Sequence, residues 1–240
     1  MKRILIIIPT YNEKENIARM VESVFQQSDD FHLLIVDDNS PDGTAGLIKE
    51  LMEQYPNRLF LESRQGKLGL GTAYIHGFKW GIKNNYDYIL EMDADFSHPP
   101  EKLIELVAAC ENGADIAVGS RYTSGGKVKD WPMSRIMLSY FANLYVQFIT
   151  WIPCRDATAG FVCYKKEVLE TINLDSIKFI GYAFQIEMKY KAWKLGFGIA
   201  EVPITFVDRI RGTSKMSTHI FKEAMFGVLE LKWKGLTGKL

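Results

Sequence analysis

The chain has 240 residues, and its 29 lysines and arginines are balanced by 29 aspartates and glutamates. This length suits one large domain, or a domain with an appended subdomain, and either can bury a sizeable core. The neutral balance gives no electrostatic reason to expect a nucleic-acid partner. Cys110, Cys154 and Cys163 are odd in number and lack metal-site spacing, so we expect reduced thiols in a cytoplasmic protein rather than a disulfide framework.

Short apolar runs alternate with segments of helical periodicity along the first half of the chain, which is typical of a parallel sheet covered by helices. The first run begins at once and is too short for a secretory signal or a membrane span. The predicted strands are Arg3 to Ile8, Leu33 to Val36, Leu59 to Glu62, Tyr88 to Met92 and Asp115 to Val118. The predicted helices are Ile17 to Phe25, with Asn12 as N-cap and Glu15 as its reciprocal partner, then Thr44 to Met52, Thr72 to Ile82 and Pro100 to Asn112.

Polar clusters follow three of these strands, at residues 9–13, 37–44 and 93–95. In open α/β sheets, ligands bind beyond the carboxyl ends of the strands, so we expect the three clusters to form one site. Asp38 could accept hydrogen bonds from a base or ribose, and Tyr11 could stack nearby. Residues 37–44 also fit a plain turn followed by a helix cap, because Asn, Ser, Pro, Asp and Gly all favour turns.

Asp93 and Asp95 are the most informative of these residues. Two carboxylates one residue apart at the end of a strand can project into a cleft together, and hard oxygen ligands suit Mg²⁺ or Mn²⁺ bound to a diphosphate. The motif by itself also fits a solvated acidic loop. The sequence therefore favours a metal-bound nucleotide here only in combination with the neighbouring clusters.

The glycine-rich segment from Arg64 to Ala73 suggests a phosphate-binding loop, because glycines let backbone amides approach an anion at the start of a helix. The segment does not end in the Gly-Lys-Ser/Thr of a Walker A motif. It also does not follow the first strand, as a dinucleotide fingerprint requires. Neither standard motif is therefore assigned.

Five motifs in a fixed order carry a family resemblance: Pro-Thr-Tyr-Asn-Glu at 9–13, Asp-Asp-x-Ser-x-Asp-Gly-Thr at 37–44, Lys-x-Gly-Leu-Gly-Thr-Ala at 67–73, Met-Asp-Ala-Asp-x-Ser-His at 92–98 and Gly-Ser-Arg-Tyr at 119–122. The pattern continues through Arg135, Asp156-x-Thr-x-Gly-Phe161, Gly181-Tyr-x-Phe-Gln-x-Glu187 and Phe206-x-x-Arg-x-x-Gly-x-Ser-Lys215. The chain resembles the inverting GT-A glycosyltransferases of family two, and among them the polyprenyl (dolichyl) phosphate mannose synthases. The resemblance covers residues 3–217.

The resemblance implies a GT-A nucleotide-diphospho-sugar transferase fold, with a mostly parallel sheet flanked by helices, and transfer of mannose from GDP-mannose to a polyprenyl phosphate with inversion. It assigns metal binding to Asp93 and Asp95, with Ser97 as a weaker third ligand. It assigns the acceptor phosphate to Arg121, Arg135 and Ser139, and counts Asp93, Asp95, Arg121 and Arg135 as catalytic. It assigns the nucleotide sugar to Pro9, Tyr11, Glu13, Val36, Asp38, Lys67, Ala94, Arg209 and Lys215.

A phosphate acceptor agrees with the chemistry of these residues. A sugar hydroxyl must lose a proton before it attacks, so transfer to a hydroxyl usually requires a positioned base. A polyprenyl phosphate is already an anion, and the protein then needs arginines and a metal rather than a dedicated base. His98 and Glu187 are candidate bases, although a loop histidine that only hydrogen-bonds and a carboxylate on a helix face are the alternatives.

Two segments suggest access to a membrane surface. Residues 136–152 hold no charged side chain, and a helix of that length would extend about 26 Å, slightly short of the ~30 Å hydrocarbon core. Arg135, Ser139, Asn143 and Gln147 form one polar stripe on this otherwise apolar segment, which predicts a helix in the headgroup region with its stripe toward the active site. An ordinary buried helix is the alternative.

The second segment is the basic tail. From Arg209 onward there are seven lysines and arginines and only two glutamates. Its apolar positions are Ile220, Phe221, Ala224, Met225, Val228 and Leu229, followed by Lys232-Trp233-Lys234. We expect residues 218–240 to form an amphipathic tail that anchors at an anionic leaflet, after a catalytic domain at 1–217. The protein would then bind the membrane peripherally or through a separate membrane subunit.

Three alternatives stay open. The same reaction could use UDP-glucose, because no motif selects the base or the sugar on physical grounds. Transfer to a saccharide hydroxyl would require a base and would leave Arg121 and Arg135 without an anion. A catalytically inactive membrane-associated binding module is the third alternative, and the intact Asp93 and Asp95 speak against it.

Overall fold

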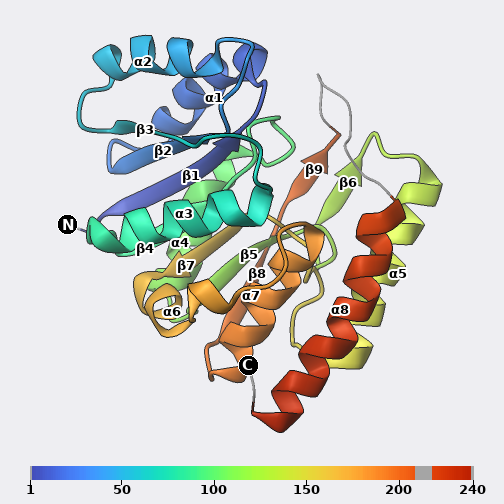
Figure 1. The fold of residues 1–240 in the computed structure, drawn as a ribbon. Helices are drawn as coiled ribbons and strands as arrows, with labels where there is room; N and C mark the ends of the chain where they lie inside the picture. The colour runs from blue at the N-terminus through green and yellow to red at the C-terminus, as the bar shows by residue number, and fades with distance from the viewer. Residues whose placement is uncertain (1, 209–217, 239–240) are drawn as a thin grey trace.

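The computed structural model describes residues 2–208 and 218–238. These residues form a seven-stranded sheet with helices on both faces, and a two-stranded sheet lies beside it (Figure 1). The order in the large sheet is β3-β2-β1-β4-β7-β5-β8. All neighbouring strands are parallel except that β7 runs antiparallel to β4 and to β5. The predicted α/β class with a mostly parallel sheet is confirmed.

The strands are β1 Ile4–Thr10, β2 Phe31–Asp37, β3 Leu59–Ser63, β4 Tyr88–Glu91, β5 Ile116–Ser120, β6 Lys127–Lys129, β7 Val162–Lys165, β8 Ile199–Pro203 and β9 Thr205–Val207. The helices are α1 Lys14–Phe25, α2 Thr44–Gln54, α3 Leu70–Lys83, α4 Leu103–Glu111, α5 Met133–Thr150, α6 Lys166–Thr171, α7 Tyr182–Lys194 and α8 Thr218–Thr237, with 3-10 turns at Pro100–Lys102 and Leu174–Ser176. Every strand and helix predicted in the first half of the chain is present, with ends that differ by up to three residues.

The start of α1 differs from the prediction. Asn12 has a left-handed φ of 60°, and the N-cap of α1 is Glu13, without a side-chain cap of its own. The first amides are instead capped by the loop after β2, since Asp42 accepts from Lys14 N at 3.1 Å and the Thr44 hydroxyl from Glu13 N at 3.1 Å. The local capping box of Asn12 and Glu15 was wrong because a tertiary contact supplies the cap.

Two hydrophobic cores lie on opposite faces of the sheet. Alternate residues of β1 enter each core: Ile6 and Ile8 pack with α1, α2 and α4, whereas Leu5 and Ile7 pack with α3, α6 and α7. A strand that is buried on both faces needs apolar residues at nearly every position, which explains the continuous run at the start of the chain. All three cysteines are buried and free of disulfides.

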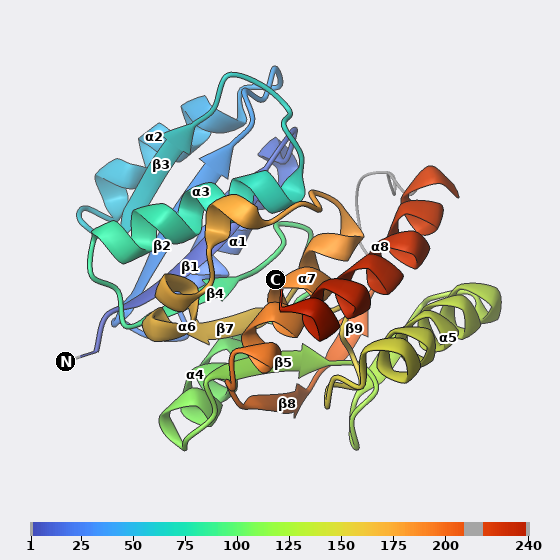
Figure 2. The same ribbon diagram turned by 60° about the horizontal axis from the view of Figure 1, so that its bottom comes forward.

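The helices α5 and α8 lie side by side at one edge of the molecule (Figures 1 and 2). The Tyr145 hydroxyl donates to Met225 O at 2.9 Å, and Lys232 Nζ lies 3.4 Å from the centre of the Trp151 ring. The helix α5 begins three residues before the predicted Ile136 and ends at Thr150, where Trp151 turns into the left-handed region. Among the described residues, no helix has the length and hydropathy needed to cross a bilayer.

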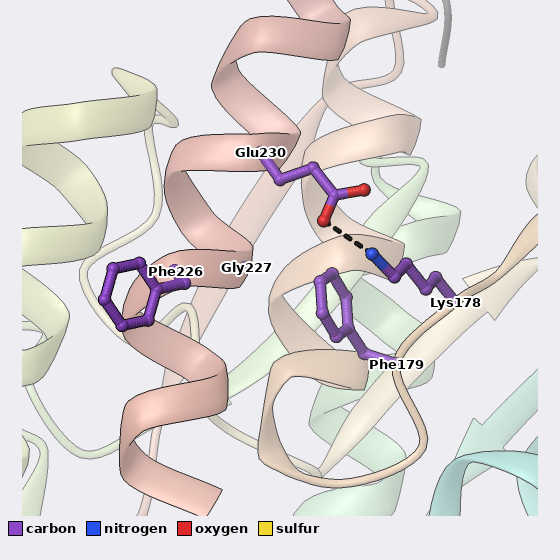
Figure 3. A pocket seen from close by; sticks show the side chains of 5 residues that line it. All are labelled: Lys178, Phe179, Phe226, Gly227 and Glu230. Carbon is purple, nitrogen blue, oxygen red and sulfur yellow. Dashed lines mark hydrogen bonds and ion pairs between the residues drawn. The ribbon is translucent and has the colours of Figure 1, made fainter.

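The helix α8 also packs on the segment before α7. Gly227 lies directly against Phe179, because a Cβ at Gly227 would come within 2.6 Å of that ring. Lys178 donates to Glu230 at 2.6 Å, and a pocket of about 230 Å³ remains between the two segments (Figure 3). Val228 and Leu231 are buried in the core on this face. The second half of the tail is therefore packed onto the sheet domain.

Two glycines, one in α3 and one in α2, allow a test of how closely α3 packs on the sheet. A Cβ at Gly77 would come within 2.7 Å of Ile7 on β1, so Gly77→Ala should overpack the core and lower the free energy of unfolding by about 1–3 kcal/mol. Gly46 lies in α2 with nothing within 4 Å of its Cβ position, so Gly46→Ala should raise stability by roughly 0.5–1 kcal/mol. Denaturant unfolding measures both. Equal effects of the two variants would contradict the close contact of α3 with the sheet.

Candidate active site

The carboxyl ends of β1 and β2 are tied together by buried hydrogen bonds. The Thr10 hydroxyl donates to Asp37 Oδ1 at 2.9 Å, and the same carboxylate accepts from Ser40 N and Oγ at 2.9 and 2.6 Å. Asp42 accepts from both the amide and the hydroxyl of Thr44. For Asp37, Ser40, Asp42 and Thr44 the turn-and-cap interpretation is confirmed, and these residues shape the loop beside the site.

Asp38 joins this loop to the glycine-rich segment. Its Oδ1 accepts from Arg64 Nε at 2.6 Å, and its Oδ2 accepts from Leu68 N at 3.3 Å. Arg64 also donates a hydrogen bond from NH1 to the hydroxyl of Thr72, in the first turn of α3, at 2.8 Å. Both side chains of the ion pair are buried. Arg64 was not predicted as a site residue, and it fixes the glycine-rich segment against the end of β2.

The predicted nucleoside residues lie at this edge in different environments. Lys67 Nζ lies 5.0 Å from the centre of the Tyr11 ring, so the glycine-rich segment and the β1 loop meet there. Glu13 accepts from Asn16 Nδ2 at 2.9 Å. The side chains of Val36 and Ala94 are buried in the core, so these two residues would meet a ligand through their backbone. Pro9 is half-buried.

Asp93 and Asp95 follow β4 at the same edge of the sheet. The Tyr74 hydroxyl donates to Asp93 Oδ1 at 3.2 Å, and Ser97 N donates to Asp95 Oδ1 at 3.0 Å. Burial, together with the Asp93 charge, raises the pKa of Tyr74 well above its ordinary value, so this hydroxyl keeps its proton and donates it to the carboxylate. The Ser97 side chain is buried, and its metal contact stays a prediction.

The two aspartates have the donor chemistry of a Mg²⁺ or Mn²⁺ site. Within the described residues, no larger set of histidine, cysteine, aspartate and glutamate side chains is placed to hold a metal ion by itself. Magnesium in nucleotide enzymes is usually held by one or two carboxylates together with phosphate oxygens and water. Asp93 and Asp95 therefore fit an ion that arrives with a diphosphate.

Neither candidate base is placed for proton abstraction. His98 accepts from Asp93 N at 3.1 Å through Nδ1 and stacks on Phe161, with ring centres 5.0 Å apart. This is the hydrogen-bonding loop histidine of the alternative interpretation. Glu187 is buried, accepts from the amides of Lys178 and Phe179 at 2.9 and 3.0 Å, and pairs with Lys191 at 3.0 Å. Glu187 is therefore a carboxylate on a helix, as the alternative interpretation has it, and it is buried because it caps the segment before α7.

Arg121 follows β5 and forms a bidentate ion pair with Asp156. Its Nε donates to Oδ2 at 2.7 Å and its NH2 to Oδ1 at 2.6 Å, and NH2 also reaches the Thr158 hydroxyl at 2.8 Å. Asp156 is fully buried. Burial by itself would favour its neutral form, but the guanidinium and the hydrogen bonds prevail and lower the pKa of Asp156. The pair therefore stays charged, and the guanidinium is held in one orientation.

Arg135 lies in the first turn of α5, close to Arg121. Its guanidinium carbon is 3.9 Å from the centre of the Trp131 ring, and that of Arg121 is 5.7 Å from the same centre. Arg135 NH1 donates to Asp208 at 3.0 Å. Ser139, one turn further along α5, is half-buried, and its carbonyl accepts from Asn143 Nδ2 at 3.0 Å. The structure thus brings together the two arginines predicted for the acceptor phosphate.

Some residues of the site carried no signal in the sequence. Arg64 and Asp208 gain their roles from partners far away in the chain, Asp38 for Arg64 and Arg135 for Asp208. Trp131 lies between the two arginines, and no motif marked it. Glu91 is buried two residues before Asp93, and this burial raises its pKa to about 8. Arg209 and Lys215, which were predicted to contact the donor, lie outside the described residues.

Comparisons with known proteins identify the family. The model of the glycosyl transferase family 2 matches residues 5–172. A polyprenol monophosphomannose synthase from Mycolicibacterium smegmatis is 47% identical over 239 residues, which cover 100% of this chain and 89% of that protein. An undecaprenyl-phosphate mannosyltransferase from Micrococcus luteus is 43% identical over 242 residues, with 99% of each chain covered.

The fold has relatives of much lower sequence identity. A mannosyltransferase from Pyrobaculum calidifontis, whose structure was solved in complex with GDP-Man and Mn²⁺, superposes with a TM-score of 0.60 at 16% identity. The superposition covers 98% of this chain and 74% of that one. Together with the family model, this likeness identifies the architecture. The chain belongs to glycosyl transferase family 2, and its sheet and flanking helices form the GT-A fold of a glycosyltransferase.

Proposed function

We propose that the protein transfers a mannosyl group from GDP-mannose to a polyprenyl phosphate, with inversion at the anomeric carbon. The observation that carries this proposal is its likeness, over the whole chain, to two enzymes named for mannosyl transfer to polyprenyl phosphates. Sequence likeness of this extent favours a shared acceptor class. The site geometry supports the proposal from both the donor and the acceptor side.

The donor side is the edge formed by β1, β2 and β4. The nucleoside would lie between Tyr11, Lys67 and the Asp38 loop, where the structure places a ring, a cation and a buried carboxylate. Asp93 and Asp95 would hold Mg²⁺ or Mn²⁺ on the diphosphate. When bound, the ion stabilises the negative charge that develops on the departing diphosphate.

The acceptor side is the neighbourhood of Trp131. Arg121 and Arg135 would receive the lipid phosphate through charge-assisted hydrogen bonds, which guanidinium groups form with phosphate in a fixed geometry. A phosphate needs no deprotonation before it attacks. A saccharide hydroxyl would require a positioned base, and both bases that the sequence offered already have partners, His98 at the Asp93 amide and Glu187 at Lys191. These contacts favour the phosphate acceptor.

The helix α5 has the two faces that an amphiphilic acceptor requires. Its polar stripe faces the protein, where Asn143 and Gln147 hydrogen-bond to Thr158 and to the carbonyl of Arg155. The opposite face is exposed, which does not fit an ordinary buried helix. The large exposed side chains of α5 and the residue after it are Met133, Met137, Leu138, Tyr140, Phe141, Leu144, Phe148 and Trp151.

The helix α8 lies beside α5 (Figure 2). Its exposed large apolar residues are Met225, Phe226, Leu229, Trp233 and Leu236. We infer that the two helices form a membrane-docking surface on the cytoplasmic leaflet, because both expose many large apolar side chains, such exposure marks interaction sites, and the proposed acceptor is a lipid. Among the predicted tail residues, Val228 packs inward instead, and the side chains of Ile220, Phe221, Lys222 and Ala224 lie outside the described residues.

A transfer assay with a panel of radiolabelled sugar nucleotides tests the proposed function. With polyprenyl phosphate and Mg²⁺ or Mn²⁺, we expect transfer from GDP-mannose and little from UDP-glucose. A chelator should stop the reaction. Preference for UDP-glucose, or transfer to a saccharide in place of the lipid phosphate, would replace the proposal with one of the alternatives. Binding of substrates without any transfer would indicate an inactive module.

The same assay tests the metal site. Asp93→Asn and Asp95→Asn should each lower transfer by orders of magnitude while the circular dichroism spectrum is unchanged, because a lost ligand removes transition-state stabilisation rather than core packing. Asp175→Asn is the control, since that side chain is 81% exposed in a surface ion pair. Metal-dependent turnover in both site variants would exclude Asp93 and Asp95 as the ligands.

Arg135 allows a test of the acceptor side with a matched control. Its side chain is 27% exposed, lies over an aromatic ring and pairs with an aspartate. Arg58 is 25% exposed, lies 4.5 Å from the Phe25 ring centre and pairs with Asp29. Arg135→Ala should raise the KM for polyprenyl phosphate about ten- to hundredfold, because a hydrogen bond to a charged group contributes roughly 1.5–3 kcal/mol.

The donor provides the contrast in this experiment. The Kd for GDP-mannose, measured by calorimetry, should stay nearly constant in Arg135→Ala, and Arg58→Ala should change neither constant. Arg121→Ala is expected to lower the free energy of unfolding by about 3–5 kcal/mol as well, because it leaves Asp156 buried without its partner. Equal loss of donor binding in Arg135→Ala would move this arginine to the nucleotide side.

Liposome flotation tests the docking surface. Binding should rise with anionic lipid and fall in high salt, since each basic residue near the surface contributes about 1 kcal/mol. Changing Phe148, Phe226 and Trp233 to serine should reduce binding, and transfer to a long-chain acceptor should fall more than transfer to a short soluble one. Ile104→Ser is the control, because Ile104 is an exposed apolar residue of α4. A protein that ignores all liposomes yet uses long-chain acceptor in detergent would point to a separate membrane subunit.

A further inference from the structure

The helix α7 carries a lysine that is completely buried. Lys189 has 0% exposure, and a buried ammonium requires partners because an uncompensated charge in the core is strongly unfavourable. It donates to Ala159 O at 2.6 Å, Ala157 O at 3.3 Å, Gln185 O at 3.2 Å and Gln185 Oε1 at 3.1 Å. An ammonium has three hydrogens for these four acceptors, so its donor capacity is fully used inside the protein.

Two of these acceptors lie in the turn formed by residues 156–160, which belongs to neither a helix nor a strand. They flank Thr158, whose hydroxyl accepts from Arg121 at 2.8 Å and from Asn143 of α5 at 3.1 Å. The same turn begins with Asp156, the ion-pair partner of Arg121. One buried cation thus holds the backbone on both sides of the residue that connects Arg121 with α5.

Lys189 also reaches the metal side of the site. Gln185 donates from Nε2 to Glu91 Oε2 at 2.5 Å, and Glu91 ends β4 two residues before Asp93. Gly160, the last residue of the turn, lies next to both Gln185 and His98, because a Cβ there would be 3.5 Å from Gln185 and 3.8 Å from His98. His98 in turn accepts from the amide of Asp93. The turn is therefore placed between the aspartates and the arginines.

We propose that Lys189 is a positioning residue for the acceptor side of the active site. By holding the carbonyls of Ala157 and Ala159, it places the 156–160 turn, and through that turn it orients Arg121 and α5 relative to the end of β4. This role rests on the proposed function, since it assumes that Arg121 faces the acceptor. A misplacement of about 1 Å at such a site lowers the rate by a large factor, up to roughly a hundredfold.

The same helix provides a matched control. Lys191 is also buried, with 6% exposure, and its ammonium donates to the carbonyl and the hydroxyl of Ser176 and pairs with Glu187. These contacts lie at the segment before α7, away from the 156–160 turn. Lys189→Met and Lys191→Met both replace a buried ammonium with an apolar chain of similar length. A role in stability alone predicts the same consequences for both variants.

Kinetics and hydrogen exchange together test the proposal. Both variants should lose thermal stability. Only Lys189→Met should raise the KM for polyprenyl phosphate, by about tenfold or more, with the KM for GDP-mannose changed less than about twofold. Only Lys189→Met should speed hydrogen exchange of the backbone amides of Arg121 and Thr158. In the unmodified protein the amide of Arg121 donates to Asp156 at 2.9 Å, and that of Thr158 donates to Asn143 at 3.1 Å. Equal behaviour of the two variants in both measurements would overturn the proposal.

The exchange measurement requires no substrate, so it separates this proposal from the proposed function. If the unmodified protein transfers nothing to polyprenyl phosphate, the proposed function fails, and faster exchange only in Lys189→Met would still support the positioning of the turn. If Lys189→Met does not fold, a double variant with Glu91→Gln removes both titratable groups that share Gln185. Compared with Glu91→Gln alone, the double variant should show the same faster exchange at Arg121 and Thr158, and unchanged exchange would overturn the proposal.

Discussion

The parallel pairing of β1 with β2 and β4 brings the candidate site residues of this protein to one edge of the sheet. Strands that run in the same direction end at the same edge, so the residues after each strand meet there although the chain separates them widely. Because these strands are buried on both faces, a shift in register by one residue would exchange the two cores. The hydrophobic packing of the sheet therefore also holds Tyr11, Asp38 and Asp93 at one edge.

Around this edge, charged side chains are oriented by partners within the protein. Arg64 pairs with Asp38, Arg121 with Asp156, and Arg135 with Asp208. The first two pairs are buried, and such pairs add little net stability, although loss of one partner is strongly unfavourable. Their value here is orientation: a guanidinium that is already fixed loses little further entropy when a phosphate binds. The site is thus largely organised before a ligand arrives.

The helix α5 connects this organised site to the surface. Its polar stripe carries Arg135 and Asn143, which bond to Asp208 and Thr158, whereas its opposite face is exposed and apolar next to α8. A polyprenyl phosphate has the same division, with a charged head and a hydrocarbon chain. In the proposed function, one amphipathic helix would supply both a cation for the phosphate and a surface that enters the lipid beside it. The packing of α8 on Phe179 keeps this surface attached to the domain.

The α/β class, the position of the early strands, the three polar clusters and the polar stripe of α5 could be predicted from the sequence alone. These features depend on hydrophobic period and on residue order, which are local properties. The family followed from motifs in order. Which charges pair depends on how the elements pack in three dimensions. Asp38 pairs with Arg64, 26 positions away in the chain, and Arg135 pairs with Asp208, 73 positions away. Glu187 and Lys189 are buried hydrogen-bonding groups of α7, and the sequence pattern of this helix did not indicate which of its faces is buried. The strength of an ion pair depends on the distance between the charges and on their burial. Neither quantity can be read from the spacing of residues along the chain, so these pairings are established only when the elements pack together.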